Sequence, residues 1–185
     1  MKHPLEFVST EYRKRLFFAF LIPTLILLVI FEILDQPLKT PASPNGILSF
    51  ELAHTSEKAF QILVSWESIP NPGMPIKRER LFAAFDLGID YLFMPLYAFA
   101  LAFGTLLAAN RHGGGFKSLG AVAGYGAFVA AGLDAVENYA LFQILLNRMQ
   151  SPYPEIAFYC ASIKFALLIF GILYGTVSGL WPKTK

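Results

Sequence analysis

The sequence predicts an all-α, polytopic membrane protein: a bundle of four transmembrane helices, with short interfacial helices in a long first loop. Hydrophobic residues make up 55% of its 185 residues and charged residues 15%, whereas a soluble domain is about 45–50% apolar. The charges gather between four long apolar runs instead of alternating with apolar positions, as they would on amphipathic surface helices. We expect residues 1–185 to form a single membrane domain.

The first apolar run, at about 16–34, follows the basic triplet Arg13-Lys14-Arg15. A basic start before an apolar stretch is also typical of signal peptides, whose apolar core is about 7–15 residues long. The run here is longer and has about the length that spans a bilayer. We therefore expect a retained first transmembrane helix.

Three further runs, at about 81–107, 119–146 and 156–180, are each long enough to cross a bilayer with some tilt. The stretch from Asn110 to Ser118 contains three consecutive glycines and Lys117, but it lacks the glycine directly before the lysine that a phosphate-binding loop requires. We predict a plain turn there, and Asn147 to Pro154 as the last connection.

The loop at 35–80 is different from the others. Both of its ends are rich in turn residues, namely Pro37, Pro41, Pro44, Asn45 and Gly46, then Pro70, Pro72, Gly73 and Pro75. Between them, 47–66 is apolar enough to pack, and Thr55 or Ser56 can cap a helix. We expect one or two short helices against the membrane surface, with Trp66 at the interface.

Basic residues favour cytoplasmic termini. Four crossings place both termini and the Asn110–Ser118 turn on one side, and more lysines and arginines lie there than on the long-loop side. The run Lys77-Arg78-Glu79-Arg80 on the long-loop side works against this orientation.

Small residues predict close helix packing. Gly171, Gly175 and Gly179 recur four apart in the last run, and Gly120 and Gly124 do so in the third. These smooth faces meet each other or a second copy, so the expected partners are membrane lipids and either a homo-oligomer or a larger membrane complex. A net charge of +2 without a continuous basic stripe argues against nucleic acid. The single cysteine, Cys160, excludes an internal disulfide.

Acidic residues inside the predicted helices form the candidate site. Each ionisable group in a membrane costs about 2.5–3.5 kcal/mol on insertion scales. Asp86 and Asp90 lie one turn apart in the second run, and Asp134, Glu137 and Asn138 lie within about one turn in the third. Lys164 is in the fourth run.

Topology places these groups at a similar depth. Counted from the long-loop side at ~1.5 Å per residue, Asp90, Glu137, Lys164 and Asp134 lie roughly 12–18 Å in. Asp86 is shallower, Glu32 and Asp35 lie at the same mouth, and the loop above carries Glu51 and His54. The predicted ligand-binding residues are Asp86, Asp90, Asp134, Glu137, Asn138, Lys164, Glu51 and His54.

One lysine does not balance four buried carboxylates. Protonated carboxylates, cations reaching in from the rim such as Arg78, Arg80 or His54, or a bound cation would each restore the balance. Oxygen-only donors suit calcium, magnesium or manganese, and the metal ligands would be Asp90, Asp134 and Glu137. The alternative is a structural network in which Lys164 pairs with Glu137 or Asp90.

Three stretches resemble a group of bacterial membrane proteins of uncharacterised activity. They are Phe50-Glu51-Leu52-Ala53 with Ser65-Trp66, Leu87-Gly88-Ile89-Asp90-Tyr91-Leu92-Phe93 with Tyr97, and Asp134-Ala135-Val136-Glu137-Asn138-Tyr139-Ala140-Leu141. The resemblance, which spans the chain from Ile47 onward, implies a four-helix fold and a bacterial inner (plasma) membrane. The layout is also similar in topology to the sterol-isomerase and sigma-2-receptor family, whose chemistry is an analogy only.

Three functions fit these observations. The acidic cavity could bind a cation or an amine-bearing lipophile, with ion- or proton-coupled transport. The protein could instead be an accessory subunit of a membrane complex. It could also be an enzyme acting on a lipid or isoprenoid through paired carboxylates, for which the sequence names no catalytic residue.

Overall fold

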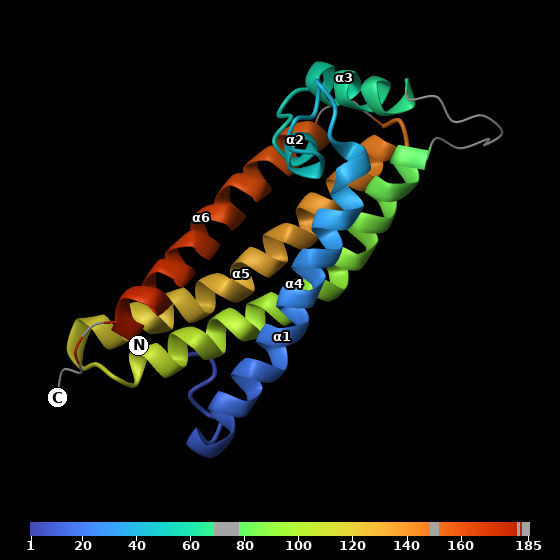
Figure 1. Ribbon diagram of the computed structural model, residues 1–185. Helices are drawn as coiled ribbons and strands as arrows, with labels where there is room; N and C mark the ends of the chain where they lie inside the picture. The colour runs from blue at the N-terminus through green and yellow to red at the C-terminus, as the bar shows by residue number, and fades with distance from the viewer. Residues whose placement is uncertain (69–77, 149–151, 181, 183–185) are drawn as a thin grey trace. The chain divides into compact units, whose positions relative to one another are not determined.

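A computed structural model has seven helical elements within the residues that it describes, and Figure 1 shows how the helices are arranged. The structure describes residues 1–68, 78–148, 152–180 and 182; the predicted turn residues Pro70, Pro72, Gly73 and Pro75, and Lys77, lie outside these ranges. The elements are α1 (Thr10–Asp35), the 3-10 turn η1 (Gln36–Leu38), α2 (Ile47–Glu51), α3 (Ser56–Glu67), α4 (Arg78–Ala109), α5 (Gly114–Leu145) and α6 (Tyr153–Leu180). The prediction of an all-α four-helix bundle is confirmed.

Four helices, α1, α4, α5 and α6, are long and apolar enough to cross a membrane, so the chain is an integral membrane protein. In their most apolar windows α4 and α5 bury 56% and 44% of their residues, while α6 and α1 bury only 22% and 11%. Helices α4 and α5 therefore supply most of the protein contacts, and α1 and α6 present more apolar surface to lipid.

All four long helices begin before the predicted residue: α1 at 10 and not about 16, α4 at 78 and not 81, α5 at 114 and not 119, and α6 at 153 and not 156. The predicted Asn110–Ser118 turn is therefore shorter than expected. Gly114 has a positive φ of 61°, which a glycine adopts without strain. Gly114, Gly115 and Lys117 belong to the start of α5 and not to the turn.

The chain divides into two compact units, to which each long helix contributes a segment. Unit 1 contains residues 1–26, 93–132 and 163–185, and unit 2 contains residues 27–92 and 133–162. Each is described below by itself.

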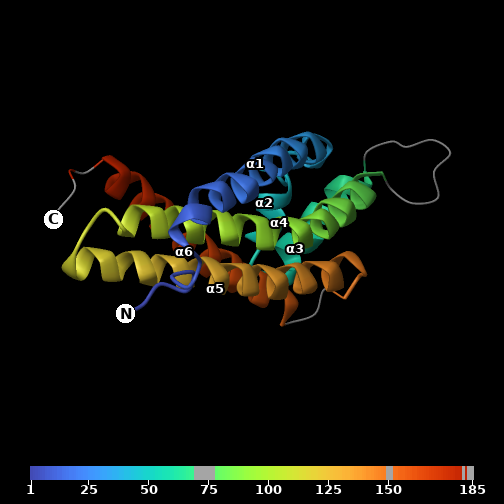
Figure 2. The ribbon, with the colours of Figure 1, turned by 90° about the horizontal axis from the view of Figure 1, so that it is seen from below.

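Unit 1 is built around an aromatic core and an N-terminal segment, residues 1–9, that packs on α4 and α5. Leu5 joins a cluster with Phe103, Leu106 and Ala127. Buried His3 accepts a hydrogen bond from the Leu5 N–H at its Nδ1, and its Nε2 lies 3.2 Å from Oγ1 of Thr105. Figure 2 shows this segment crossing α5.

Glycines let elements of unit 1 approach closely. A side chain at Gly120 would meet Tyr174 of α6, and one at Gly171 would meet Leu101 of α4. Gly124 lies against the ring of His3. These three glycines serve contacts within the chain, whereas Gly175 and Gly179 face open space. A contact of the glycine faces with a second copy stays a prediction.

Unit 2 has its core beneath the loop helices. Leu38, Phe50, Leu63 and Trp66 pack with residues of α4, α5 and α6 in one buried cluster. The expected cap is confirmed, because Oγ1 of Thr55 accepts a hydrogen bond from the N–H of Lys58.

Trp66 was expected at the membrane interface, and that prediction is wrong. Its side chain is fully buried and stacks edge-on against Phe50. Its indole Nε1 donates to the carbonyl of Leu38 at 2.9 Å and to Oγ of Ser43 at 3.0 Å. The loop folds back on itself and supplies these acceptors, so the indole N–H needs no water.

Candidate functional site: acidic side chains of unit 2

Asp86 is the most informative of the predicted site residues. It lies on α4, is 5% exposed, and its Oδ1 is buried without a hydrogen-bond partner among the residues that the structure describes. Within the described residues it forms no ion pair. Leaving a buried polar atom without a partner costs about 1–3 kcal/mol.

Two other carboxylates lie within Coulombic range of Asp86. They are Glu51, at the end of α2, and Asp35, at the end of α1. We call Asp35, Glu51 and Asp86 the inner acidic cluster. It brings together three elements that are distant in sequence, and the two nearby charges that act on Asp86 are both negative.

A second group of polar side chains joins α4 to α5. Asn138, which is 1% exposed, donates hydrogen bonds from Nδ2 to Oδ2 of Asp90 at 2.8 Å and to the carbonyl oxygen of Leu87 at 3.2 Å. Next to Asp90 on α4, the hydroxyl of Tyr91 donates to the carbonyl oxygen of Ala135 on α5 at 3.4 Å. Asn138 therefore acts as a clamp between the two helices.

Asp134 and Glu137 are buried on α5 at 2% and 0% exposure. Asp134 and Asp90 both lie within Coulombic range of the Tyr91 hydroxyl. Unit 2 thus contains all of the predicted carboxylates together with Asn138.

The remaining predicted residues have other surroundings. His54 has a positive φ of 63°, and its ring stacks on Phe158 at 4.3 Å between centroids and meets Tyr159 edge-on at 5.7 Å. Lys164 belongs to unit 1, is 5% exposed, and its ammonium lies 4.7 Å from the centroid of the Phe165 ring. The expectation that the acids converge around Lys164 stays a prediction.

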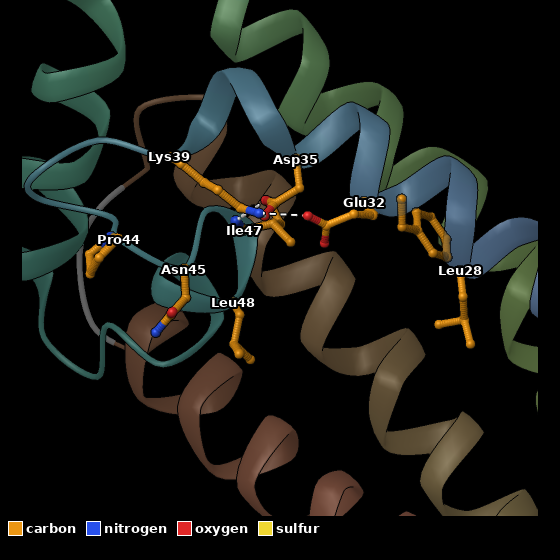
Figure 3. Close-up of a pocket in the computed structure, with 9 residues that line it drawn as sticks. Leu28, Glu32, Asp35, Lys39, Pro44, Asn45, Ile47 and Leu48 are labelled. Carbon is orange, nitrogen blue, oxygen red and sulfur yellow. Dashed lines mark hydrogen bonds and ion pairs between the residues drawn. The ribbon is translucent and has the colours of Figure 1, made fainter.

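Lys39 was not predicted as a site residue, and it holds the rim of the inner acidic cluster. Its Nζ lies 2.8 Å from Oε1 of Glu32 and 3.8 Å from Oδ2 of Asp35 (Figure 3). The hydrogen bond to Glu32 raises the pKa of Lys39 above its ordinary value, so the ammonium stays charged. Asp35 and Lys39 are four residues apart, but Lys39 lies after α1 and η1 have ended, so the helical i,i+4 rule gave no signal for this pair.

A pocket of about 430 Å³ opens beside these three side chains. It lies between the end of α1 and the start of α2, and Figure 3 shows Glu32, Asp35 and Lys39 turned toward one another within it. The remaining lining residues are Leu28, Phe31, Pro44, Asn45, Ile47 and Leu48. Asp35 thus belongs to both the pocket and the inner acidic cluster.

The expected metal ligands gain no support from the geometry. In the part of the chain that the structure describes, no three histidine, cysteine, aspartate or glutamate side chains are placed so that they could hold a metal ion. The assignment of Asp90, Asp134 and Glu137 as metal ligands stays a prediction.

Comparison of the chain with models of protein families, with curated proteins and with solved structures gives no match. The resemblance to bacterial membrane proteins and the topological analogy with the sterol-isomerase and sigma-2-receptor family accordingly stay predictions. The chain is an integral membrane protein of four apolar helices with buried charged residues.

Proposed function

We propose that this protein binds the protonated amine of a lipophilic ligand at the inner acidic cluster, with Asp86 as the residue that receives it. The observation that carries the proposal is the buried Oδ1 of Asp86, which has no hydrogen-bond partner in the described part of the chain. An ammonium N–H would supply the missing donor.

Charge supports a cationic ligand. The groups acting on Asp86 are the carboxylates Glu51 and Asp35, and like charges in a weakly polar site repel strongly. A bound cation would replace this repulsion by attraction. It is one of the three ways, considered from the sequence, to balance the charge of the buried carboxylates.

The side chains around Asp86 are apolar, so a ligand that reaches it would need an apolar body beside its cationic group. Ala83 and Leu87, which flank Asp86 on α4, are buried in the apolar core of unit 2 with Phe50. Ligand sites are commonly lined by apolar side chains with a few polar groups that fix orientation.

Thermal unfolding of the full-length protein in a non-ionic detergent tests this proposal. The probes are a single-chain alkylamine below its critical micelle concentration and the alcohol of the same chain length. A ligand at about 100 times its Kd stabilises the folded state by about 2.7 kcal/mol, so the amine should raise the Tm and the alcohol should not.

Two variants make the test specific. Asp86→Asn should abolish the shift by the amine, whereas the control Glu57→Gln, at an exposed position on α3, should retain it. Equal shifts with amine and alcohol, or a full amine shift in folded Asp86→Asn protein, would overturn the proposal.

Transport is the further step that the sequence predicts. In this proposal the protein lies in a bacterial inner membrane with its termini in the cytoplasm. The ligand would cross that membrane, and its movement would be coupled to that of ions or protons. Flux of a labelled alkylamine into proteoliposomes under an imposed pH gradient, compared between the native protein and Asp86→Asn, tests that step. The two alternatives, an accessory subunit and a carboxylate-pair enzyme, predict no such flux.

A further inference from the structure

The pocket between α1 and α2 shares Asp35 with the inner acidic cluster, but it carries an inference that does not depend on Asp86. It lies where the first membrane span, Thr10–Leu38, ends, directly before Lys39. The end of a transmembrane helix is the level at which lipid headgroups meet the protein. Its occupant would therefore be in contact with both hydrocarbon and water.

The lining has one apolar side and one charged side. Leu28, one helical turn before Glu32 on α1, and Leu48 on α2 are 48% and 36% exposed and flank the opening. Glu32, Asp35 and Lys39 supply two carboxylates and one ammonium on the other side. This combination matches an amphiphile whose headgroup bears both charges.

The hydrogen bonds leave room for both halves of such a headgroup. Glu32 accepts from Lys39 at 2.8 Å and from Gln36 at 2.6 Å, and both bonds go to Oε1. The Glu32 side chain is 64% exposed, so Oε2 can accept from an incoming ammonium. An ammonium has three donors, so Lys39 can bind a phosphate oxygen while it keeps its bond to Glu32.

We propose that this pocket binds the headgroup of a phosphatidylethanolamine-type lipid, with the lipid ammonium on Glu32, the phosphate on Lys39 and the acyl chain along Leu28. A choline headgroup has no N–H to donate to Glu32. An anionic glycerol headgroup brings no cation to the two carboxylates. A volume of about 430 Å³ falls within the size range of small-molecule sites, about 300–1,000 Å³.

Native mass spectrometry of the full-length protein tests the assignment, with phosphatidylethanolamine, phosphatidylcholine and phosphatidylglycerol of identical acyl chains competing at equal concentration. We expect the ethanolamine lipid to be retained about tenfold more than the choline lipid, which is the size expected of one charge-assisted hydrogen bond. Equal retention of the two would overturn the proposal.

Two substitutions separate the roles of the charged side chains. Glu32→Gln should remove the preference for ethanolamine over choline, while Lys39→Gln should weaken both lipids alike, because both carry the phosphate. The matched control is Glu57→Gln, and each variant is checked for an unchanged far-ultraviolet spectrum. An unaltered preference in folded Glu32→Gln protein would contradict the assignment.

A third arm asks whether the lipid itself is the ligand. Soluble phosphoethanolamine at the same concentration should not displace the bound lipid, because it lacks the chain that contacts Leu28. Complete displacement would overturn the assignment to a lipid. The Asp86→Asn variant should keep its ethanolamine preference, so failure here and failure of the proposed function are told apart.

Discussion

The carboxylate of Asp35, the last residue of α1, accepts a 2.6 Å hydrogen bond from the backbone N–H of Ile47, the first residue of α2. The bond closes the turn-rich start of the long loop over the end of the first membrane span. Asp35 also lies within Coulombic range of Asp86. The same side chain therefore fixes the loop and helps to define the inner acidic cluster.

Gly46 is required by this arrangement. Its φ is +54°, and a Cβ there would collide with the Asp35 carboxylate. We predict that Gly46→Ala lowers the free energy of unfolding by about 1–3 kcal/mol through backbone strain and displacement of Asp35. Unfolding in mixed detergent micelles measures the loss. The control Gly88→Ala, in a helix with open space around it, should cost nothing. Equal behaviour of the two variants would contradict the prediction.

The Asp86 carboxylate is expected to lower the free energy of unfolding of the folded protein. Replacing Asp86 with leucine, which also branches at Cγ, removes a buried oxygen without a partner and a carboxylate that lies near two others. We predict that Asp86→Leu raises the free energy of unfolding by about 1–3 kcal/mol and eliminates amine binding. Parallel unfolding and ligand-shift measurements check both effects. A destabilised Asp86→Leu protein would show that the carboxylate supports the fold.

Asn138 is expected to behave in the opposite way. Both of its hydrogen bonds reach α4, one to Asp90 and one to the Leu87 carbonyl. Asn138→Leu should lower stability by about 1–2 kcal/mol, in the upper range measured for polar contacts between membrane helices. A double-mutant cycle with Asp90→Ala isolates the direct contact. Strict additivity of the two substitutions would mean that the 2.8 Å bond contributes nothing.

His3 makes the anchoring of the N-terminal segment sensitive to pH. Burial lowers the pKa of His3 from 6.5 to about 4, although the nearby Glu6 opposes this; Arg13 adds to the lowering. Thr105 of α4 faces the His3 ring, and Lys117 of α5 forms an ion pair with Glu6, which lies near His3. Protonation would remove the Nδ1 acceptor used by the Leu5 N–H.

The sign follows from the lowered pKa. Stability from neutral His3 is fully present above pH 6.5, falls as the unfolded state takes up a proton below it, and is lost by about pH 4. We expect the Tm difference between the native protein and His3→Gln to shrink from pH 7.5 to pH 4. Lys117 and Glu6 are unchanged in that variant, so their contributions cancel. A difference that does not vary with pH would refute the prediction.

Several features could be predicted because their causes are local. The Thr55 cap depends on one hydroxyl three residues before the N–H of Lys58. The four spans follow from apolar runs whose length matches a bilayer. The ionisable side chains within the predicted transmembrane helices could be recognised because burying each one in a membrane costs free energy, wherever its partner lies.

Trp66 and Lys39 were misjudged from the sequence for the same reason: their hydrogen-bond partners could not be identified from the neighbouring residues. Trp66 was assigned to an interface because its own chemistry suits one, but the Leu38 carbonyl and Ser43 hydroxyl satisfy its N–H inside the loop. Lys39 was overlooked because it lies beyond the end of α1, and Glu32, to which it donates a hydrogen bond, is seven residues earlier inside that helix.

The sequence by itself determined that this chain crosses a membrane as four helices and carries carboxylates within them, because composition and run length act on each segment separately. Only the tertiary structure decided which carboxylates meet. Asn138 donates a hydrogen bond to Asp90, whereas Asp35 is contacted by Lys39 and by the N–H of Ile47. Oδ1 of Asp86 has no hydrogen-bond partner among the described residues. Those differences depend on contacts between α1, α2, α4 and α5 that are distant along the chain, and no local pattern encodes them.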